Sequence, residues 1–245
     1  MEASTNNVAG HRAKYDYLDK SLSKEEVGRT FVGGGDAVLM GFFELETIRN
    51  FKQLKGSGIV DVGCGIGRLT KYLLEENVGQ YLGIDIIPEI LHDAIEAAKG
   101  HPNFKFAIGE NCKIPTHNDS FDVVCGFSLI THLLEEEIFE YFLEARRVLR
   151  SNGVAVFSFL DFENPNHQAL FFTHARNHRH GHGDLLKFMT KSVLRIFATE
   201  AGFSATSFLE NGTADISVNG RSSLIDGRAA PRNLAIGQSV CVMTV

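Results

Sequence analysis

The 245-residue sequence lacks the features of several large classes of protein. No apolar run is long enough to cross a bilayer. The first residues, Met-Glu-Ala-Ser-Thr-Asn-Asn, have neither the basic nor the apolar region of a secretory signal. Acidic residues outnumber basic ones by 30 to 24, a net charge of −6, so no excess positive charge is available for binding a polyanion. We therefore expect a cytoplasmic protein that binds neither membrane nor nucleic acid.

Cysteine is also scarce. The four cysteines are far apart and form no C-x-x-C pair, which predicts free thiols in a reduced compartment: Cys64, Cys112, Cys125 and Cys241. The apolar share of 44% and the charged share of 22% are ordinary for a globular protein. A chain of 245 residues can bury a sizeable core in one large domain, and we find neither an internal repeat nor a second-domain boundary.

Strand-like and helix-like segments alternate along most of the chain. We predict strands at 58–62, 80–84, 104–108, 121–126 and 153–159. We predict helices at 36–54, 67–76, 88–99 and 136–149. Strands separated by helices of this length form βαβ units, whose right-handed crossovers place helices on both faces of a mostly parallel sheet.

The last part of the chain has a different pattern. Thr190 or Ser192 can cap a helix that Gly202 ends. Two strand candidates, 203–209 and 237–244, follow with no helical pattern between them, so we expect them to pair antiparallel at the sheet edge. The sequence therefore predicts an α/β protein with a seven-stranded sheet and an antiparallel last strand. The polar, glycine-rich stretch between these strands is either a functional segment or ordinary disorder.

A glycine-rich loop lies within residues 59–70, Ile-Val-Asp-Val-Gly-Cys-Gly-Ile-Gly-Arg-Leu-Thr. Its pattern predicts a strand, a tight turn and the start of a helix. Glycines at 63, 65 and 67 allow the backbone to approach a nucleotide-like ligand closely. The dinucleotide fingerprint G-x-G-x-x-G would need glycine where Arg68 stands. The spacing therefore favours a nucleoside site over a pyrophosphate site.

Further segments follow the glycine loop at 61–68 in a fixed order: 83–85, 109–111 with 114–115, 120–124 and 145–153. Together they resemble the motifs of the class I S-adenosylmethionine-dependent methyltransferases, and most of all those of their small-molecule branch. The resemblance covers roughly residues 58–160. It implies a Rossmann-like methyltransferase domain over 56–245 with a substrate-covering insertion around 162–190. Residues 1–55 would then form an N-terminal helical extension or lid.

The resemblance also implies S-adenosylmethionine as cofactor, bound outside the carboxyl ends of the strands. The methionine part would lie against the glycine loop, the ribose hydroxyls on Asp85, and the adenine beside Glu110, where the family commonly has aspartate. The predicted cofactor-binding residues are Asp61, Gly63, Cys64, Gly65, Gly67, Asp85, Ile86, Glu110, Asn111 and Phe127. The structural alternatives are a turn needed only for helix packing at the glycines, a structural cap at Asp61, a cap of the next helix at Asp85 and an exposed loop acid at Glu110.

One residue is a candidate for catalysis. His132 follows the fourth strand near the expected sulfonium, and neutral imidazole can accept a proton at cellular pH. We predict a base or a substrate contact there, with a structural histidine as the alternative. Cys125 lies in a buried strand without a preceding proline, which disfavours a cytosine-methyltransferase nucleophile. Gly126-Phe127-Ser128 stands in place of the D/N/S-P-P-aromatic signature of nucleic-acid amino-methyltransferases.

A histidine-rich run follows the fifth strand, at His167, His174, His178, His180 and His182. Its spacing matches no established ligand motif, so we predict no metal, with a divalent ion bound by these residues and nearby acids as the alternative. Five aromatic residues are expected to line or close an apolar substrate pocket: Tyr15, Tyr17, Phe31, Phe171 and Phe172. The glycine run 33–35 fits either a lid hinge or a plain loop.

We therefore predict a methyltransferase that modifies an oxygen or nitrogen of a small-molecule acceptor, a natural product or metabolite. The alternatives are a protein or peptide methyltransferase and a methyltransferase-like subunit that binds without catalysis. A nucleotide-binding oxidoreductase is disfavoured by Arg68. The oligomeric state is left open.

Overall fold

The computed structural model describes residues 16, 36–178, 185–210, 222–231 and 237–245. The strands are β1 (Gly58–Val62), β2 (Gln80–Asp85), β3 (Phe104–Ile108), β4 (Phe121–Gly126), β5 (Leu149–Asp161), β6 (Phe188–Met189), β7 (Ala205–Leu209) and β8 (Ser239–Thr244). The helices are α3 (Ala37–Arg49), α4 (Arg68–Leu73), α5 (Pro88–Ala97), α6 (Glu135–Val148), α7 (Pro165–His178) and α8 (Lys191–Glu200), with a 3₁₀ turn η1 at Ile130–His132.

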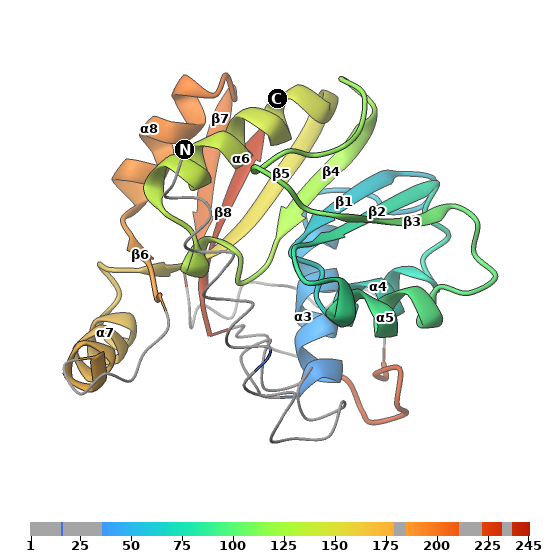
Figure 1. The fold of residues 1–245 in the computed structure, drawn as a ribbon, viewed down its shortest axis with the longest axis horizontal. Coiled ribbons are helices and arrows are strands. Elements are labelled where there is room, and N and C mark those ends of the chain that lie inside the picture. Colours follow the sequence, from blue (N-terminus) through green and yellow to red (C-terminus); the bar gives the residue numbers. More distant parts are fainter. Residues whose placement is uncertain (1–15, 17–35, 179–184, 211–221, 232–236) are drawn as a thin grey trace.

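The strands form one mixed sheet in the order β3-β2-β1-β4-β5-β8-β7 (Figure 1). Strands β1 to β5 are parallel, and β8 runs antiparallel between β5 and β7. The predicted α/β class and the antiparallel pairing of the last two strands are therefore confirmed. The short β6, which pairs with the end of β5, was not predicted. Strand order reverses between β1 and β4, and in open α/β sheets ligands bind at such a switch point.

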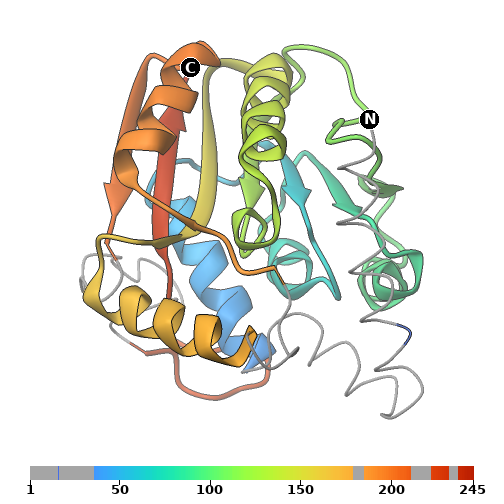
Figure 2. The ribbon, with the colours of Figure 1, turned by 60° about the vertical axis from the view of Figure 1, so that its left-hand side comes forward.

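Each face of the sheet has its own core. Ile59 and Val60 are adjacent in β1 and therefore point to opposite faces. Ile59 packs in a core with residues of α3 and α4, including Phe42 and Tyr72. Val60 packs in a second core with residues of α6 and α8, including Phe142. Figure 2 shows α6 and α8 in front of the sheet and α3 behind it, so helices cover both faces as predicted.

Most helix ends have the expected signals. Asp36 caps α3 by accepting from the backbone N–H groups of Val38 and Leu39, both at 3.1 Å. Thr190 caps α8, and Gly202 follows it with a φ of +91°. Helices α3 and α4 are shorter than predicted. Strand β5 begins at Leu149, before the predicted start at residue 153, and its register with β4 shifts in this added part.

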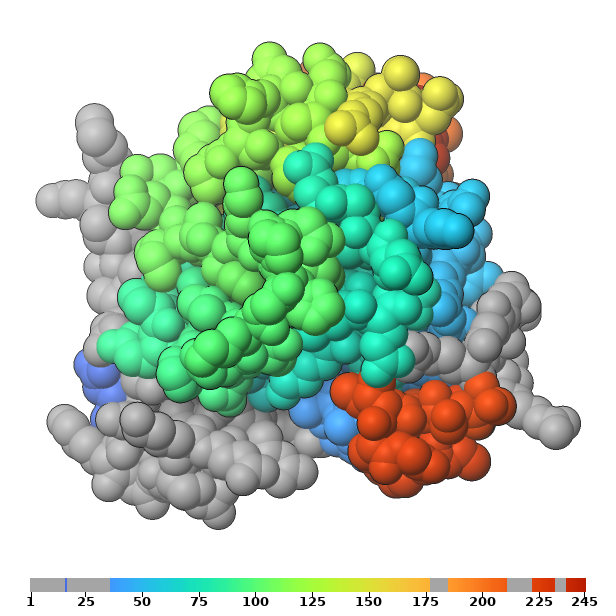
Figure 3. Space-filling model, turned by 90° about the vertical axis from the view of Figure 1, so that its right-hand side faces the viewer, coloured from blue at the N-terminus to red at the C-terminus, as the bar shows by residue number. Residues whose placement is uncertain are grey.

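Part of the long polar stretch before β8 is docked on the domain. Within residues 222–231, Leu224 is buried, and the Ile225 N–H donates to Tyr72 Oη at 3.4 Å. Arg228 pairs with Asp36 at the start of α3 through both of its terminal nitrogens. Figure 3 shows this segment, in red, beside the blue of α3. This portion of the predicted loop therefore belongs to the fold.

Helix α7 was not predicted. Among its described side chains His167 alone is buried, so the helix has no apolar stripe of helical period that the sequence could reveal. Its Phe171 ring contacts the rings of Phe162 and Phe188, with centroids 5.0 and 5.3 Å away. This aromatic cluster attaches α7 to the end of β5 and to β6.

Candidate cofactor and acceptor site

The glycine loop lies at the switch point, between the end of β1 and the start of α4. The backbone N–H groups of Gly63 and Cys64 both donate to Ile84 O, at 2.7 and 3.0 Å, which joins the loop to β2. Gly67 has a φ of +77°, and a Cβ on it would lie 2.8 Å from the Cβ of Ala94 in α5. Only glycine fits there. The loop therefore presents backbone at the edge where a nucleoside ligand would lie.

Asp85 links this loop to the next helix. Its Oδ2 accepts from Gly65 N–H and its Oδ1 from Ile87 N–H, each at 3.0 Å. Burial raises the pKa of the carboxyl group, and the backbone hydrogen bonds oppose that shift. Each oxygen has further lone pairs, so the same group can also accept from a ribose diol. The structure thus gives Asp85 the capping contact, and the ribose role stays a prediction.

Asp61 points into the core below the loop. Its side chain is buried, and Tyr81 Oη donates to its Oδ2 at 3.0 Å. Thr70 Oγ1 lies 2.8 Å from the same Tyr81 oxygen. Burial, together with the nearby Glu44 carboxylate, raises the pKa of Asp61 to about 7. These contacts are those of the structural alternative, and the cofactor contact of Asp61 stays a prediction.

Arg68, the residue that breaks the dinucleotide fingerprint, pairs with the helix preceding the sheet. Its Nη2 lies 2.7 Å from Glu44 Oε1 in α3, and both side chains are largely buried. The two helices also touch through their backbones, since a Cβ on Gly41 would lie 2.4 Å from Arg68 O. Helix α3 therefore supports the segment that follows the glycine loop.

A second loop, between β3 and β4, carries Glu110 and Asn111, which are exposed. The N–H of Gly109 donates to Asp85 O at 2.9 Å, so this loop starts beside the ribose candidate. Asn111 and Cys112 both have a left-handed backbone, with φ of 51° and 55°. The structure therefore places these predicted adenine-side residues along the same edge as Asp85 and Ile86.

The end of β4 carries a polar network that the sequence did not reveal. Ser128, with a φ of +60°, donates its N–H to Ser158 Oγ at 2.6 Å. Ser158 donates to Gln238 Oε1 at 2.7 Å, and Gln238 Nε2 donates to Ser128 Oγ at 3.1 Å. This ring joins three strand ends that are far apart in sequence. Phe127, the preceding residue and a predicted cofactor contact, is buried in the core on the α3 side.

His132 ends η1, just beyond the end of β4. Its Nδ1 lies 3.1 Å from Leu185 O. A carbonyl can only accept, so the Nδ1 of His132 carries a proton in this contact. Lys187 N–H also donates to Thr131 O at 2.8 Å. The segment leading into β6, with its aromatic cluster, is thus held against the predicted catalytic residue.

Within the histidine-rich run, the structure describes the side chains of His167 and His174. His167 accepts from Asp161 N–H at 2.8 Å through Nδ1, and its Nε2 lies 3.1 Å from Gly237 O. This buried ring joins β5, α7 and the start of β8. Across the described residues, no three His, Cys, Asp or Glu side chains gather as a metal ion requires. His180, His182 and the side chain of His178 lie outside that description. So do the predicted aromatics Tyr15, Tyr17 and Phe31 and the glycine run 33–35.

Comparison with known proteins agrees with this geometry. A profile described as a methyltransferase domain matches residues 59–153, which contain both loops and the end of β4. The chain therefore contains a methyltransferase domain. Its fold is shared by a solved S-adenosylmethionine-dependent methyltransferase from Aquifex aeolicus, with a TM-score of 0.58 at 16% identity, covering 86% of this chain and 93% of that one. No helix among the described residues is long and apolar enough to cross a membrane.

Several curated methyltransferases are similar in sequence to this one. Phosphoethanolamine N-methyltransferase 1 of Caenorhabditis elegans is 25% identical over 138 residues, 56% of this chain and 29% of that protein. The 2-methyl-6-phytyl-1,4-hydroquinone methyltransferase of Synechocystis is 30% identical over 101 residues, 41% of this chain and 31% of that protein. N-terminal Xaa-Pro-Lys N-methyltransferase 2 of Danio rerio is 28% identical over 159 residues, 60% and 54% of the two chains. This chain thus spans less than a third of the length of the first two.

Proposed function

We propose that this protein transfers the methyl group of S-adenosylmethionine to an oxygen or nitrogen of a small-molecule acceptor in the cytoplasm, without a metal or nucleic acid. The observation that carries the proposal is the contact between Gly65 N–H and Asp85 Oδ2 at the switch point. It joins a backbone cradle to a carboxylate that can bind a ribose, which is the pairing a nucleoside cofactor needs.

Different residues along this edge are proposed to bind different parts of the cofactor. The backbone around Gly63, Cys64, Gly65 and Gly67 receives the methionine part, which needs close approach without side chains. Asp85 accepts from the ribose diol, and Ile86 lies against the ribose and base. Glu110 and Asn111 approach the adenine edge. Phe127 closes the site from the core side, and Asp61 stays below the loop, bonded to Tyr81.

When bound, S-adenosylmethionine supplies an electrophilic methyl group on a sulfonium. Transfer is an in-line displacement, so positioning of the acceptor can provide roughly 7–11 kcal/mol of the barrier reduction. His132 is the proposed base. The Leu185 carbonyl orients the ring by accepting from its Nδ1–H, and the Nε2 is the proposed acceptor of the proton from an acceptor hydroxyl or amine.

The acceptor is proposed to enter beside the segment 162–190. Phe162, Phe171 and Phe188 form ring contacts there, and Leu185, which contacts His132, lies in the segment leading into β6. An apolar surface next to a general base suits a small acceptor with an aromatic or apolar body. The hydroquinone relative named above acts on a molecule of that kind. The fish relative acts on protein N-termini, which makes a peptide acceptor the second candidate.

Calorimetric titration tests the cofactor half of the proposal, and a panel of acceptors tests the rest. S-adenosylhomocysteine should bind and raise the melting temperature, since a ligand of the folded state stabilises it by mass action. With labelled S-adenosylmethionine, phenols and amines should accept label and Xaa-Pro-Lys peptides should not. Transfer of the label to the peptides and not to the small molecules would favour the second candidate, a peptide acceptor. A melting-temperature shift with a dinucleotide and none with S-adenosylhomocysteine would overturn the proposal.

A further inference from the structure

The loop between β3 and β4 adopts a conformation that needs outside support. Asn111 and Cys112 are consecutive residues with left-handed φ values, 51° and 55°. This region is unfavourable for an L-residue, because Cβ crowds the following carbonyl group. Such residues persist only where surrounding contacts determine them. Glu110 and Asn111, the proposed adenine-side residues, therefore depend on what holds the loop on either side of them.

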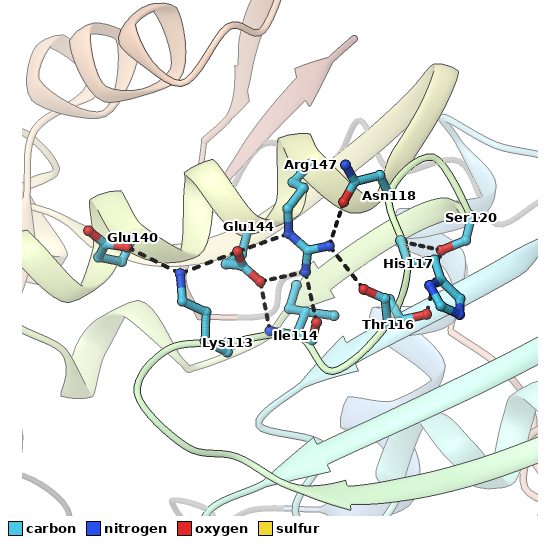
Figure 4. A network of polar contacts seen from close by, with 9 residues as sticks. All are labelled: Lys113, Ile114, Thr116, His117, Asn118, Ser120, Glu140, Glu144 and Arg147. Carbon is cyan, nitrogen blue, oxygen red and sulfur yellow. Dashed lines mark hydrogen bonds and ion pairs between the residues drawn. The ribbon is translucent and has the colours of Figure 1, made fainter.

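The far half of this loop is held by one side chain of α6. Arg147 donates from Nη1 to Thr116 O at 2.9 Å and to Asn118 Oδ1 at 2.8 Å, and from Nη2 to Ile114 O at 2.9 Å (Figure 4). Its remaining two N–H groups donate to Glu144, at 3.0 Å from Nε and 2.7 Å from Nη2. All five N–H groups of the guanidinium thus have partners, three of them in the loop.

Glu144 holds the same loop from the same helix, and we call Arg147 and Glu144 together the α6 clamp. Its Oε2 accepts from Ile114 N–H at 3.0 Å, and its Oε1 lies 3.4 Å from Lys113 Nζ. Burial opposes its ionisation, but the hydrogen bonds from Arg147 and from the Ile114 backbone outweigh burial and lower its pKa to about 2. Both N–H and C=O of Ile114 are therefore bound to α6, through Glu144 and Arg147 respectively.

The near end of the loop is held to the ribose candidate. Gly109 N–H donates to Asp85 O at 2.9 Å, at the end of β2. Residues 110–112 thus lie between two anchors, one on β2 and one on α6. Lys113 N–H closes a turn onto Glu110 O at 3.0 Å. A displacement of the α6 anchor would therefore move Glu110 and Asn111 relative to Asp85.

We infer that Arg147 and Glu144 are positioning residues for the cofactor: they touch none of it, and they set its affinity by holding the loop of Glu110 and Asn111 in place. The inference rests on the proposed function, since it concerns the adenosyl part of the same site. The α6 clamp needs arginine, because lysine keeps the positive charge but cannot form the planar fork that bonds Glu144 and three loop oxygens together.

The experiment compares Arg147→Lys with a matched control on the same helix. Arg146 points to the other side, where its Nε donates to Gly202 O at 3.0 Å, so Arg146→Lys changes the same residue type without touching the loop. S-adenosylhomocysteine is titrated by calorimetry, well below the unliganded melting temperature of each variant. Arg147→Lys should weaken binding about tenfold, the equivalent of one or two hydrogen bonds. Arg146→Lys should bind as the parent does.

Two further measurements separate positioning from general destabilisation. 5′-Methylthioadenosine, which carries the adenosyl half alone, should lose affinity in Arg147→Lys by the same factor as S-adenosylhomocysteine. Amide exchange at Ile114 should be faster in the unliganded variant, with exchange in β1 and β4 unchanged. If Arg147→Lys does not fold, Asn118→Ala removes a single exposed loop contact and should weaken binding two- to threefold.

The outcomes distinguish the two proposals. A parent protein that binds neither S-adenosylhomocysteine nor 5′-methylthioadenosine contradicts the proposed function. A parent that binds them, with Arg147→Lys or Asn118→Ala binding as tightly, overturns the positioning role. Equal weakening in the Arg146→Lys control would also overturn it, because the effect would then belong to α6 as a whole.

Discussion

Asp61 shows how a single buried carboxyl group affects the stability of the domain. The charged groups that face it are Glu44 from α3 and Arg68 from α4. The titratable groups are the Cys64 thiol from the loop, and Tyr81 and Cys125 from the adjoining strands. Burial is the largest influence and favours the neutral form. The site therefore holds a proton that the unfolded chain releases at lower pH.

The prediction concerns stability against pH. The folded pKa of Asp61, about 7, exceeds the ordinary value of 3.8, so between these values the unfolded state binds fewer protons and stability falls as pH rises. Asp61→Asn removes this dependence. The free energy of unfolding of the variant minus that of the parent should increase from pH 4.5 to pH 7.5 by a few kcal/mol, on the order expected from the pKa shift. Urea titrations measure it, and a constant difference would contradict the assignment.

Asp85 and Ile87 give a second prediction at the residue scale. Asp85→Ala loses the proposed ribose contacts and also releases Gly65 and Ile87 N–H. Asp85→Asn keeps one carbonyl oxygen and changes the other to a donor. We expect S-adenosylhomocysteine affinity to fall by more than about tenfold in the alanine variant, as loss of a charged hydrogen bond requires. Calorimetry gives the dissociation constants, and unchanged affinity in both variants would remove Asp85 from the ribose role.

His132 gives a third prediction at the residue scale. If it is the base, His132→Ala should slow turnover by about 10²-fold or more with an acceptor that must lose a proton, while S-adenosylhomocysteine affinity stays the same. His174 in α7 provides the control, because its removal leaves the imidazole at η1 intact. Single-turnover rates with the acceptor found in the panel measure the effect. An unaltered rate in His132→Ala would assign the ring to structure alone.

At the scale of elements, the contact between α3 and α4 is close enough to be broken by one methyl group. Gly41 lies against the carbonyl oxygen of Arg68, where a Cβ would sit at 2.4 Å. Gly41→Ala should therefore destabilise the protein by about 1–3 kcal/mol, the ordinary cost of overpacking, even though alanine is the better helix former. Thermal unfolding measures it. A variant more stable than the parent would show that the helices separate without cost.

The helices and strands also show what could be predicted from the sequence. The strands from β1 to β5 and the helices between them have a strong local period, and their glycine and proline signals lie within a few residues, so their existence was predicted correctly. Helix α7 buries one described side chain and β6 has two residues, so neither leaves a pattern. The glycine loop is local and was found. The Ser128, Ser158 and Gln238 ring and the α6 clamp join residues about 30 to 110 positions apart, which no spacing rule reaches.

At the scale of the whole molecule, the chain completes its sheet last. Strand β8 ends at Thr244 yet lies between β5 and β7, where it pairs with both. Its residues Val240 to Met243 are almost completely buried, in the cores of both faces. Without β8 the edge of β5 loses its backbone partners and β7 loses its only pairing within the described part of the chain. Both cores then lose apolar contacts at once.

A chain ending at residue 236 should therefore be unfolded at 25 °C and show no cooperative unfolding transition. Hydrophobic burial lost from β8 amounts to roughly 1.5–3 kcal/mol for each large apolar side chain, and a domain is stable by only about 5–15 kcal/mol in total. Calorimetry and near-ultraviolet circular dichroism compare this chain with the full one. A peptide of residues 237–245 added in excess tests the reason, because it can restore the pairings without a covalent link. A truncated chain that still melts cooperatively and binds S-adenosylhomocysteine would show that β1 to β5 are stable without the antiparallel edge.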